Sequence, residues 1–434
     1  MILSRLRSAL LAVALGLGLW TAAPGAQAQP ASVAGDPARQ VLVLLRLPAE
    51  HFRPGGDYAD AYGDGAGMAA RRRVAQRIAA DHGLKLVTSW PIPLIGVDCF
   101  VMSVPDGQTP EQVALSLAHD PGVAGAEPMH VYRAQASTEP GSAAKRETAK
   151  DPGKAGEITH NDPLYRAQPA AREWRLAELH TVATGRNVKV AVIDSMVDPA
   201  QPDLTGQIQT SQDFVLGHAA TAEQHGTGVA GIIAGLADNK IGIAGVAPRA
   251  RLMALRACWQ DGAAGAVCDT LSLAKALYYA IDHNAQVINL SLSGPADPLL
   301  GRLIDAALAR GVVVVGALDP HAADGGFPAS HPGVVAVSDD PSTSLVGAFI
   351  APGRDTPTTQ PGGRFAFVSG SSYAAAHVSG LFALLKERSG RTTPVSLVTF
   401  RPGGGPIDTC ASLLRAVGSA CPSPTGGYPT VARE

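Results

Sequence analysis

Short apolar runs alternate with amphipathic or small-residue segments through the second half of the chain. Each apolar run is continuous and rich in β-branched residues, which is typical of strands that are buried on both faces. The expected strands lie near Val188, Leu252, Val287 and Val312, and the expected helices lie around Gly228, Ser272 and Pro298. Alternation of buried strands with helices predicts an α/β fold with a parallel, doubly wound sheet.

A second pattern precedes this region, over residues 40–133. Four runs predict strands and two longer segments predict helices, in the order strand, helix, strand, strand, helix, strand. The expected strands are 41–47, 84–88, 99–104 and 123–128, and the expected helices are 68–82 and 109–119. This order predicts a separate, ferredoxin-like α/β sandwich.

Three further segments lack the pattern of a folded domain. Residues 134–160 contain few large apolar side chains, so we expect a disordered linker that is open to processing. We expect a disordered tail over 424–434 as well. Residues 1–28 carry basic residues, a short apolar core and the small-residue site Ala26–Ala28, which together predict a cleaved signal peptide. An uncleaved anchor is the alternative.

Composition narrows the function classes. The 434 residues exceed one compact domain, and the net charge of −2 gives no electrostatic reason to expect nucleic acid or an anionic membrane as a partner. From the signal-like N-terminus we expect an exported protein, in the periplasm or outside the cell, and we expect it to be a monomer.

The five cysteines fit an oxidising compartment. Cys99 lies in an alternating, strand-like run, so we expect a buried apolar residue there. Local pairing of Cys258 with Cys268 and of Cys410 with Cys421 is the simplest arrangement, although other connectivities remain open. The spacings do not fit a zinc site.

Three polar residues stand at the ends of predicted elements. Ser372 follows two small residues where a helix begins, Asp194 ends a buried strand, and His225 opens a small-residue helix. Each has a structural interpretation as a cap, a turn residue or a surface imidazole. Together they fit a nucleophile, a general base and its orienting carboxylate.

The segments 187–195, 225–235 and 370–380 resemble the three signature regions of the subtilisin-like serine peptidases, the subtilases. The resemblance covers roughly residues 161–418 and implies the subtilisin-like α/β fold. It implies that Asp194 orients the base, that His225 is the base and that Ser372 is the nucleophile. It implies no cofactor for the chemistry.

The same resemblance suggests roles for neighbouring segments. Residues 288–295 look like the strand that pairs with an extended substrate, through the main chain of Ser291, Leu292, Ser293 and Gly294. The unit at 40–133 resembles the family's inhibitory, folding-assisting propeptide, and an unrelated accessory domain is the alternative.

One departure concerns the oxyanion hole. The segment 311–320 resembles the strand that normally ends in Gly-Asn, yet no asparagine occurs from Gly311 to Ser342. Asp319 is the expected occupant of that position, and a shift of one residue would place Pro320 there. An ionised carboxylate cannot donate a hydrogen bond to an oxyanion.

Asp203 and Asn239 match positions that bind calcium in some subtilases, where the carbonyls of Ala237, Ile241 and Ile243 would complete an oxygen cage. The alternative is that both are plain turn or loop residues.

The sequence therefore predicts a secreted serine endopeptidase that is made as a self-processing zymogen. Its partners would be a peptide or protein substrate and its own propeptide. The missing asparagine keeps one alternative open, which is a catalytically weak relative that binds peptides or a partner protein.

Overall fold

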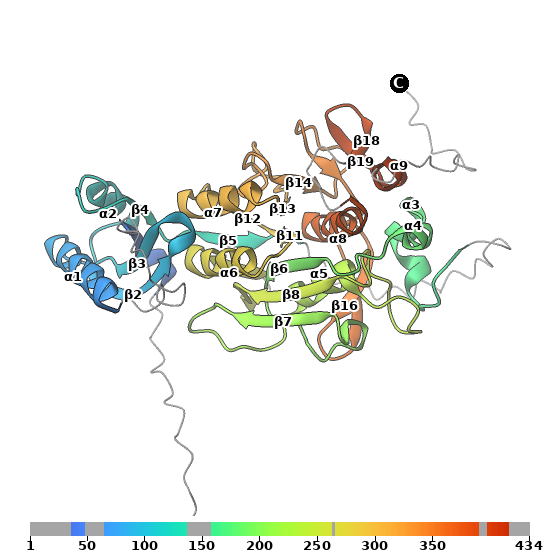
Figure 1. Ribbon diagram of the computed structural model, residues 1–434, viewed down its shortest axis with the longest axis horizontal. Helices are drawn as coiled ribbons and strands as arrows, with labels where there is room; N and C mark the ends of the chain where they lie inside the picture. Colours follow the sequence, from blue (N-terminus) through green and yellow to red (C-terminus); the bar gives the residue numbers. More distant parts are fainter. Residues whose placement is uncertain (1–35, 48–64, 137–157, 263–264, 390–396, 416–434) are drawn as a thin grey trace, which may run out of the picture. The chain divides into compact units, whose positions relative to one another are not determined.

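The computed structural model describes residues 36–47, 65–136, 158–262, 265–389 and 397–415 (Figure 1). All of them belong to one packed unit of the chain, residues 34–434. The signal-peptide and tail predictions, and most of the linker prediction, lie outside the described residues.

A nine-stranded sheet forms the centre of the larger part, in the order β18-β19-β15-β14-β13-β11-β6-β8-β7. All neighbours run parallel except β18 and β19. The strands are β6 (Lys189–Asp194), β7 (Ile208–Asp213), β8 (Arg251–Arg256), β11 (Val287–Leu290), β13 (Val313–Ala317), β14 (Val335–Ser338), β15 (Phe349–Ile350), β18 (Val398–Arg401) and β19 (Gly404–Asp408). The predicted α/β fold with a parallel sheet is confirmed.

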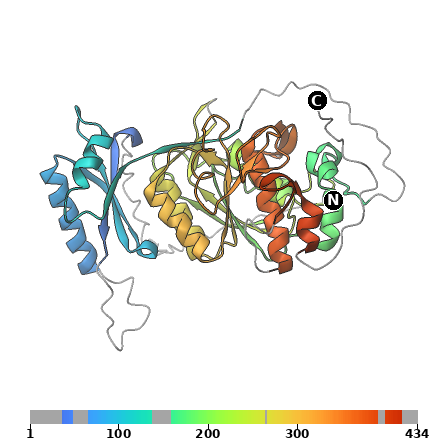
Figure 2. The same cartoon turned by 90° about the horizontal axis from the view of Figure 1, so that it is seen from above.

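Helices cover both faces of this sheet, as the strand composition requires. In β6, Val190 and Val192 belong to the apolar cluster that includes α5 (Gln224–Ala234) and α8 (Ser371–Ser389). The alternate residues Ala191 and Ile193 belong to a second cluster, with α6 (Thr270–Asp282) and α7 (Pro298–Ala309). Figure 2 shows the yellow pair α6 and α7 and the orange-red α8 on different sides of the strands.

The N-terminal part has the predicted order of elements. Its sheet runs β2-β3-β1-β4 with antiparallel neighbours, and α1 and α2 pack on one face. The elements are β1 (Gln40–Arg46), α1 (Gly65–Asp81), β2 (Lys85–Ile92), β3 (Val97–Ser103), α2 (Pro110–Leu117) and β4 (Gly125–Pro128). The second strand runs four residues further than the predicted 84–88. The expected burial of Cys99 is confirmed, and burial raises the pKa of its thiol.

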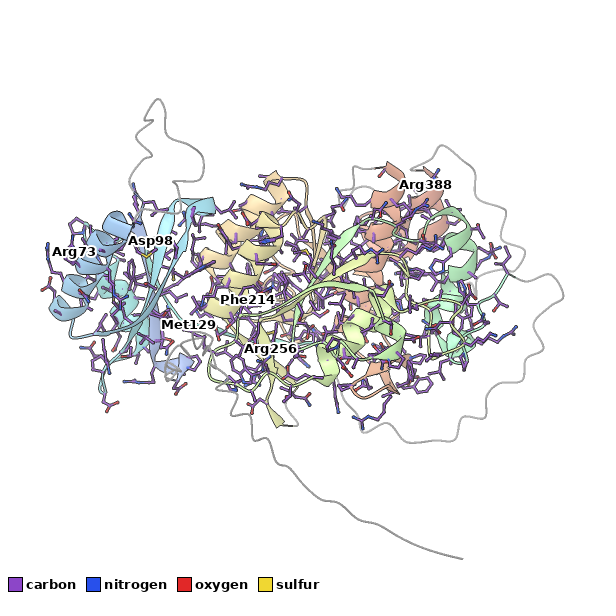
Figure 3. All side chains as sticks on the ribbon, turned by 60° about the horizontal axis from the view of Figure 1, so that its bottom comes forward. Arg73, Asp98, Met129, Phe214, Arg256 and Arg388 are labelled. Carbon is purple, nitrogen blue, oxygen red and sulfur yellow. A yellow bond between two sulfur atoms is a disulfide. The ribbon has the colours of Figure 1, made fainter. Side chains whose placement is uncertain are left out.

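The other face of this small sheet contributes to the cluster around α6 and α7, through residues such as Leu42 and Val101. Trp90 packs edge-on against Tyr278 of α6, and Arg302 of α7 donates to the carbonyl of Ile95. Figure 3 labels Asp98 and Met129 in the N-terminal part.

A strand that the sequence does not predict connects the two parts. β5 (Val131–Ala134) lies between β12 (Leu292–Ser293) and β10 (Ala266–Asp269), in a small sheet of order β12-β5-β10-β9 that includes β9 (Cys258–Gln260). The chain is therefore ordered at Ala134–Ala136, where the sequence places the start of the linker. The remaining elements are α3 (Pro169–Glu173), α4 (Leu176–Val182), the hairpin β16 (Thr356–Gln360) and β17 (Arg364–Val368), α9 (Thr409–Arg415) and 3-10 turns at Pro37–Arg39, Pro93–Ile95, Tyr165–Ala167 and Pro202–Leu204.

Candidate active site

Asp194 and His225 meet where a strand of the central sheet ends. Asp194 is the last residue of β6, and His225 is the second residue of α5. Nδ1 of His225 lies 2.7 Å from Oδ1 of Asp194, and that oxygen also accepts from the backbone N–H of Ser195 at 2.6 Å. Both side chains are buried, so the carboxylate holds the ring in one orientation and favours the tautomer with a proton on Nδ1.

A glycine allows the helix to come this close. A Cβ atom on Gly226 would lie 2.2 Å from the carbonyl oxygen of Ser195, which real side chains do not tolerate. The N–H of Gly226 instead donates to the Ser195 hydroxyl at 2.9 Å. The close approach of α5 to the end of β6 therefore depends on this glycine.

Ser372 is the second residue of α8 and is fully buried. Its hydroxyl donates to the carbonyl of Ser291 at 2.8 Å, and its backbone N–H donates to the carbonyl of Gln135 at 3.0 Å. Nε2 of His225 is buried, and within the described part of the chain it has no hydrogen-bond partner. The serine hydroxyl must therefore rotate away from Ser291 before it can donate to His225.

A tyrosine packs against the base. The rings of Tyr373 and His225 have centroids 5.6 Å apart, and Tyr373 is buried. Burial, and secondarily the charge of Asp194, raises the pKa of the Tyr373 hydroxyl. This ring therefore packs against the His225 imidazole inside the protein.

The residues predicted to bind substrate lie beside β5, an extended segment of this same chain. Leu292 and Ser293 pair antiparallel with Ala134 and Arg133 of β5. Two hydrogen bonds join Ser291 and Ser372. The Ser372 hydroxyl donates to the carbonyl of Ser291, and the Ser291 hydroxyl donates to the carbonyl of Ser372 at 2.9 Å. The fourth residue, Gly294, forms a bridge with Phe327 and faces the ring of Tyr132.

The opposite edge of β5 is held by β10, which sequence reasoning missed. Val131, Tyr132 and Arg133 pair with β10, and the disulfide between Cys258 and Cys268 joins β10 to β9. The second predicted pair includes Cys421, which lies outside the described residues. The only sequence signal for β10 is Cys268, which lies within this strand.

Asp319 follows β13 and lies in a turn. Its carboxylate accepts from the N–H of His321 at 2.8 Å, and its own N–H donates to Gly325 at 2.9 Å. Among the described residues no hydrogen bond joins Asp319 to Ser372. Pro320, the other predicted occupant, is exposed and has no N–H to donate. The N–H of Ser372, by contrast, donates to a peptide carbonyl, that of Gln135.

A buried cation pairs with carboxylates at the strand ends beside Asp194. Arg256 ends β8 in register with Asp194, and it is labelled in Figure 3. It lies 2.9 Å from Asp213 and 3.7 Å from Glu223, the residue that precedes α5. Sequence reasoning missed this arginine, since a single charge at the end of a strand carries no distinctive motif.

The predicted calcium residues contact each other. Asp203 is fully buried, and its oxygens accept from the side-chain amide of Asn239 at 2.7 Å and from the N–H of Ile243 at 2.9 Å. Burial raises the pKa of Asp203 to about 6. Nearby, Asp162 accepts from the N–H of Asp238 at 2.9 Å and from that of Asn239 at 3.1 Å.

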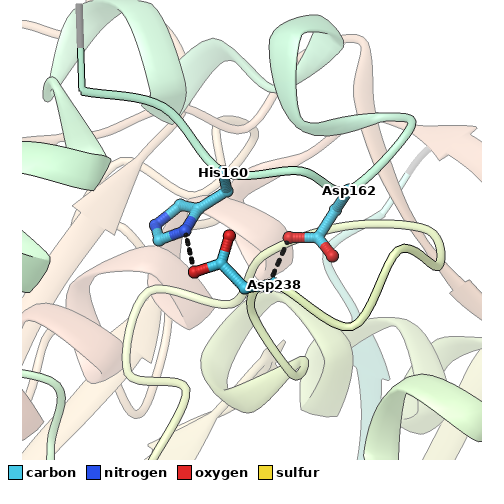
Figure 4. A group of neighbouring side chains, drawn as sticks. All are labelled: His160, Asp162 and Asp238. Carbon is cyan, nitrogen blue, oxygen red and sulfur yellow. Dashed lines mark hydrogen bonds and ion pairs between the residues drawn. The ribbon is translucent and has the colours of Figure 1, made fainter.

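Figure 4 shows that Asp162, Asp238 and His160 form one group around this loop. Their ligand atoms all lie within 4.8 Å of one another, and Nδ1 of His160 is 2.9 Å from Oδ2 of Asp238. Asp162 was not among the predicted metal ligands, although it lies at the start of the region 161–418 that resembles the subtilases.

The fold and the site together have the organisation of a serine peptidase. The sequence pattern of the Subtilase family matches residues 185–400. The chain is 33% identical to subtilisin E of Bacillus subtilis (strain 168) over 269 residues, which cover 56% of this chain and 68% of that protein. This chain therefore belongs to the subtilase family, whose members are serine endopeptidases that need no cofactor for the chemistry.

Two further relatives are matched by this chain over different shares of their length. Over 213 residues the chain is 39% identical to the thermophilic serine proteinase of Bacillus sp. (strain AK1), covering 46% of this chain and 52% of that one. Fervidolysin from Fervidobacterium pennivorans, a keratinolytic enzyme related to subtilisin, has a similar fold, with a TM-score of 0.63 and 23% identity. That likeness covers 89% of this chain and 62% of fervidolysin. The chain thus spans only about half to two thirds of these two relatives.

Proposed function

We propose that this protein is an exported serine endopeptidase that is made as a precursor and cleaves itself after Gln135. One observation carries the proposal. β5 lies between β12 and β10 as an added strand, and it brings the carbonyl of Gln135 within 3.0 Å of the N–H of Ser372. That N–H is the group expected to stabilise an oxyanion, so the bond between Gln135 and Ala136 lies where a scissile bond would lie.

The chemistry follows from the contacts around Ser372. After its hydroxyl rotates toward His225, Nε2 accepts the proton while Oγ attacks the carbonyl carbon of Gln135. Asp194 keeps the imidazole oriented and stabilises its cation. The N–H of Ser372 stabilises the oxyanion, and His225 then passes the proton to the amine of Ala136 as the acyl-enzyme forms. Water releases Gln135 in the second half of the reaction.

The N-terminal part would act as the propeptide. After cleavage, its C-terminal strand β5 would still pair with β12 and β10 along both edges. Because the same strand occupies the position of a substrate, the released part would inhibit the enzyme until it dissociates. Gly370 allows the strand to lie this close to Ser372, because a Cβ atom at residue 370 would lie 2.5 Å from the carbonyl oxygen of Gln135.

Two serine variants test the self-processing activity. Ser372→Ala should accumulate as an uncleaved precursor that does not react with a fluorophosphonate probe. Ser371→Ala is the matched control, because the Ser371 hydroxyl donates to Asp339 rather than to the catalytic residues. It should be processed and labelled like the wild type. Equal processing of Ser372→Ala in a host without other exported proteases would contradict the proposal.

Export rests on the signal-like residues 1–28. In the part of the chain that the structure describes, no helix has the length and apolar character needed to cross a membrane. We expect the secreted material to begin after Ala28 when processing is blocked by Ser372→Ala, and mass spectrometry of that material would show it. Retention of residues 1–28 would contradict a cleaved signal.

We further propose a structural calcium ion beside Asp203 and Asn239. The donor set is all oxygen, and the buried Asp203 carboxylate lacks a cationic partner among the described residues, although the Asn239 amide must turn to offer its oxygen. At 100 times the dissociation constant, calcium would add about 2.7 kcal/mol to the free energy of unfolding. The melting temperature of wild type should therefore rise with calcium, and that of Asp203→Asn should not. Equal melting of wild type in calcium and in chelator would contradict the site.

A further inference from the structure

The side chain of Tyr132 in β5 fills a closed pocket in the larger part of the protein. It is fully buried, and its ring lies 6.3 Å from the ring of Phe327, centroid to centroid. A Cβ atom on Gly294 would lie 2.4 Å from Cδ1 of Tyr132, so the pocket exists only because residue 294 is a glycine. The pocket therefore has the size of an aromatic ring.

The far end of the pocket is polar. The hydroxyl of Tyr132 lies 3.2 Å from Oδ2 of Asp297 and 3.2 Å from the carbonyl of Pro295. A phenol has one proton to donate, and both neighbours are acceptors. With β5 in place the Asp297 side chain is completely buried, so the phenol of Tyr132 contacts it away from water.

The larger part of the protein holds Asp297 in this position by itself. Oδ1 accepts from the N–H of Leu300 at 2.9 Å as the N-cap of α7, and Oδ2 accepts from the Thr270 hydroxyl at 2.8 Å. His130, 3.1 Å from Oδ2, comes from the N-terminal part and would leave with β5. Asp297 would thus keep its orientation when another peptide enters the cleft.

The register fixes which residue of a peptide reaches Asp297. Gln135 precedes the proposed scissile bond, Ala134 pairs with Leu292, and Arg133 pairs with Ser293. Tyr132 is therefore the fourth residue before that bond. A substrate strand that pairs with β12 in the same register would place its own fourth residue in this pocket.

We propose that Asp297 is a specificity-determining residue that selects peptides with tyrosine as the fourth residue before the cleaved bond. This inference rests on the proposed endopeptidase function. A phenylalanine fills the same volume but leaves Oδ2 of Asp297 without the phenol donor, and a buried acceptor that loses its partner is costly. Since Thr270 and Leu300 remain bonded, we expect about a tenfold preference for tyrosine over phenylalanine in kcat/KM.

The first test uses two fluorogenic peptides, Val-Tyr-Arg-Ala-Gln and Val-Phe-Arg-Ala-Gln, each with an amide-linked leaving group. The processed wild type should favour the tyrosine peptide about tenfold. Asp297→Ser should lower that ratio to near one, because serine can still cap α7 but is too short to reach the phenol. Asp305→Ser, on the exposed side of α7, is the matched control and should keep the wild-type ratio. Hydrolysis of both peptides at equal rates by wild type would overturn the inference and leave the endopeptidase function standing.

The second test does not depend on proteolysis. In the uncleaved Ser372→Ala chain, Tyr132→Phe and Asp297→Ser remove the two ends of the same hydrogen bond. Each should lower the melting temperature by about 2–4 °C, and the double variant should melt close to the lower single variant. Additive losses would overturn the recognition of Tyr132 by Asp297. Non-additive losses together with no hydrolysis of either peptide would support the recognition and refute the endopeptidase.

Discussion

The two sheets of the larger part contribute to the active site in different ways. The nine-stranded sheet is built from neighbouring strand–helix units, and it places Asp194 and His225 in contact without any help from the N-terminal part. The sheet β12-β5-β10-β9 combines segments that are more than a hundred residues apart, and β5 is one of its inner strands. The first sheet thus positions the proposed catalytic groups, whereas the second forms the proposed peptide-binding site, in which a segment of the same chain lies.

The largest expected effect lies on the central-sheet side of this comparison. Asp194→Asn should remove the carboxylate that orients His225, so kcat should fall about 10⁴-fold while KM changes little. Steady-state kinetics on one peptide substrate would measure both constants. Asp305→Asn, which changes an exposed carboxylate of α7, is the control and should stay within a few fold of wild type. A rise in KM as large as the fall in kcat would mean that the central sheet also contributes to peptide binding, which would contradict this comparison.

The disulfide lies in the small sheet β12-β5-β10-β9, so its removal should affect peptide binding. Cys258 and Cys268 are ten residues apart, and their disulfide joins β10, which pairs with one edge of β5, to the outer strand β9. Replacing both with serine should reduce stability by roughly 2–3 kcal/mol, by extrapolation of the loop-entropy estimate. Because β10 holds one edge of the peptide, KM should rise more than kcat falls. Denaturant unfolding and kinetics would check this, and a loss confined to kcat would contradict it.

A pH effect should appear where the N-terminal part meets α7. Burial, and next the charge of Asp297, raises the pKa of Glu127 from its ordinary 4.5 to about 8. Arg302 of α7 lowers it by a smaller amount. At a pH between these two pKa values, the Glu127 carboxyl keeps its proton in the bound N-terminal part and loses it in the released part. Rising pH therefore favours release of the cleaved N-terminal part, by up to about tenfold per pH unit, and the dependence flattens above about 8.

Dissociation constants of the cleaved complex, measured from about pH 4 to about pH 9, would cover both pKa values and so show this dependence. Glu127→Gln should flatten the curve, while His130, which also contacts Asp297, remains in both proteins. A curve of Glu127→Gln that matches wild type would show that another group controls release.

The smallest expected effect concerns Asp319, near the junction of the two sheets. Asparagine can still accept from the N–H of His321 through its oxygen, and it adds an amide donor for the oxyanion. We expect Asp319→Asn to raise kcat about tenfold or more at neutral pH, with KM little changed. Asp324→Asn is the control, since Asp324 accepts from the N–H of Gly326 in the same loop. No gain on any cleaved peptide would mean that residue 319 does not face the oxyanion.

The same comparison explains what could be predicted from the sequence. Continuous apolar runs such as β6 and β13 indicate a buried parallel sheet, because only strands covered on both faces need such composition. The βαββαβ order of the N-terminal part followed from periodicity for the same reason. The roles predicted for Asp194, His225 and Ser372 came from their positions at the ends of these elements and from the resemblance of the three segments to the subtilases.

The small sheet could not be predicted in this way. Val131–Ala134 is a four-residue run, and its partners Val267 and Leu292 are more than a hundred residues away. Nothing local in that run distinguishes a strand from the start of the linker. The orientation of the Ser372 hydroxyl toward Ser291 was equally hidden, since a rotamer depends on neighbours that only the fold supplies.

The central claim is that the chain presents its own segment to its own active site. The most direct measurement is the mass of the N-terminal fragment that copurifies with freshly processed wild-type enzyme. We predict that this fragment ends at Gln135, whose carbonyl lies 3.0 Å from the N–H of Ser372. A fragment that first appears with a different C-terminal residue, or that forms equally in Ser372→Ala, would contradict the account.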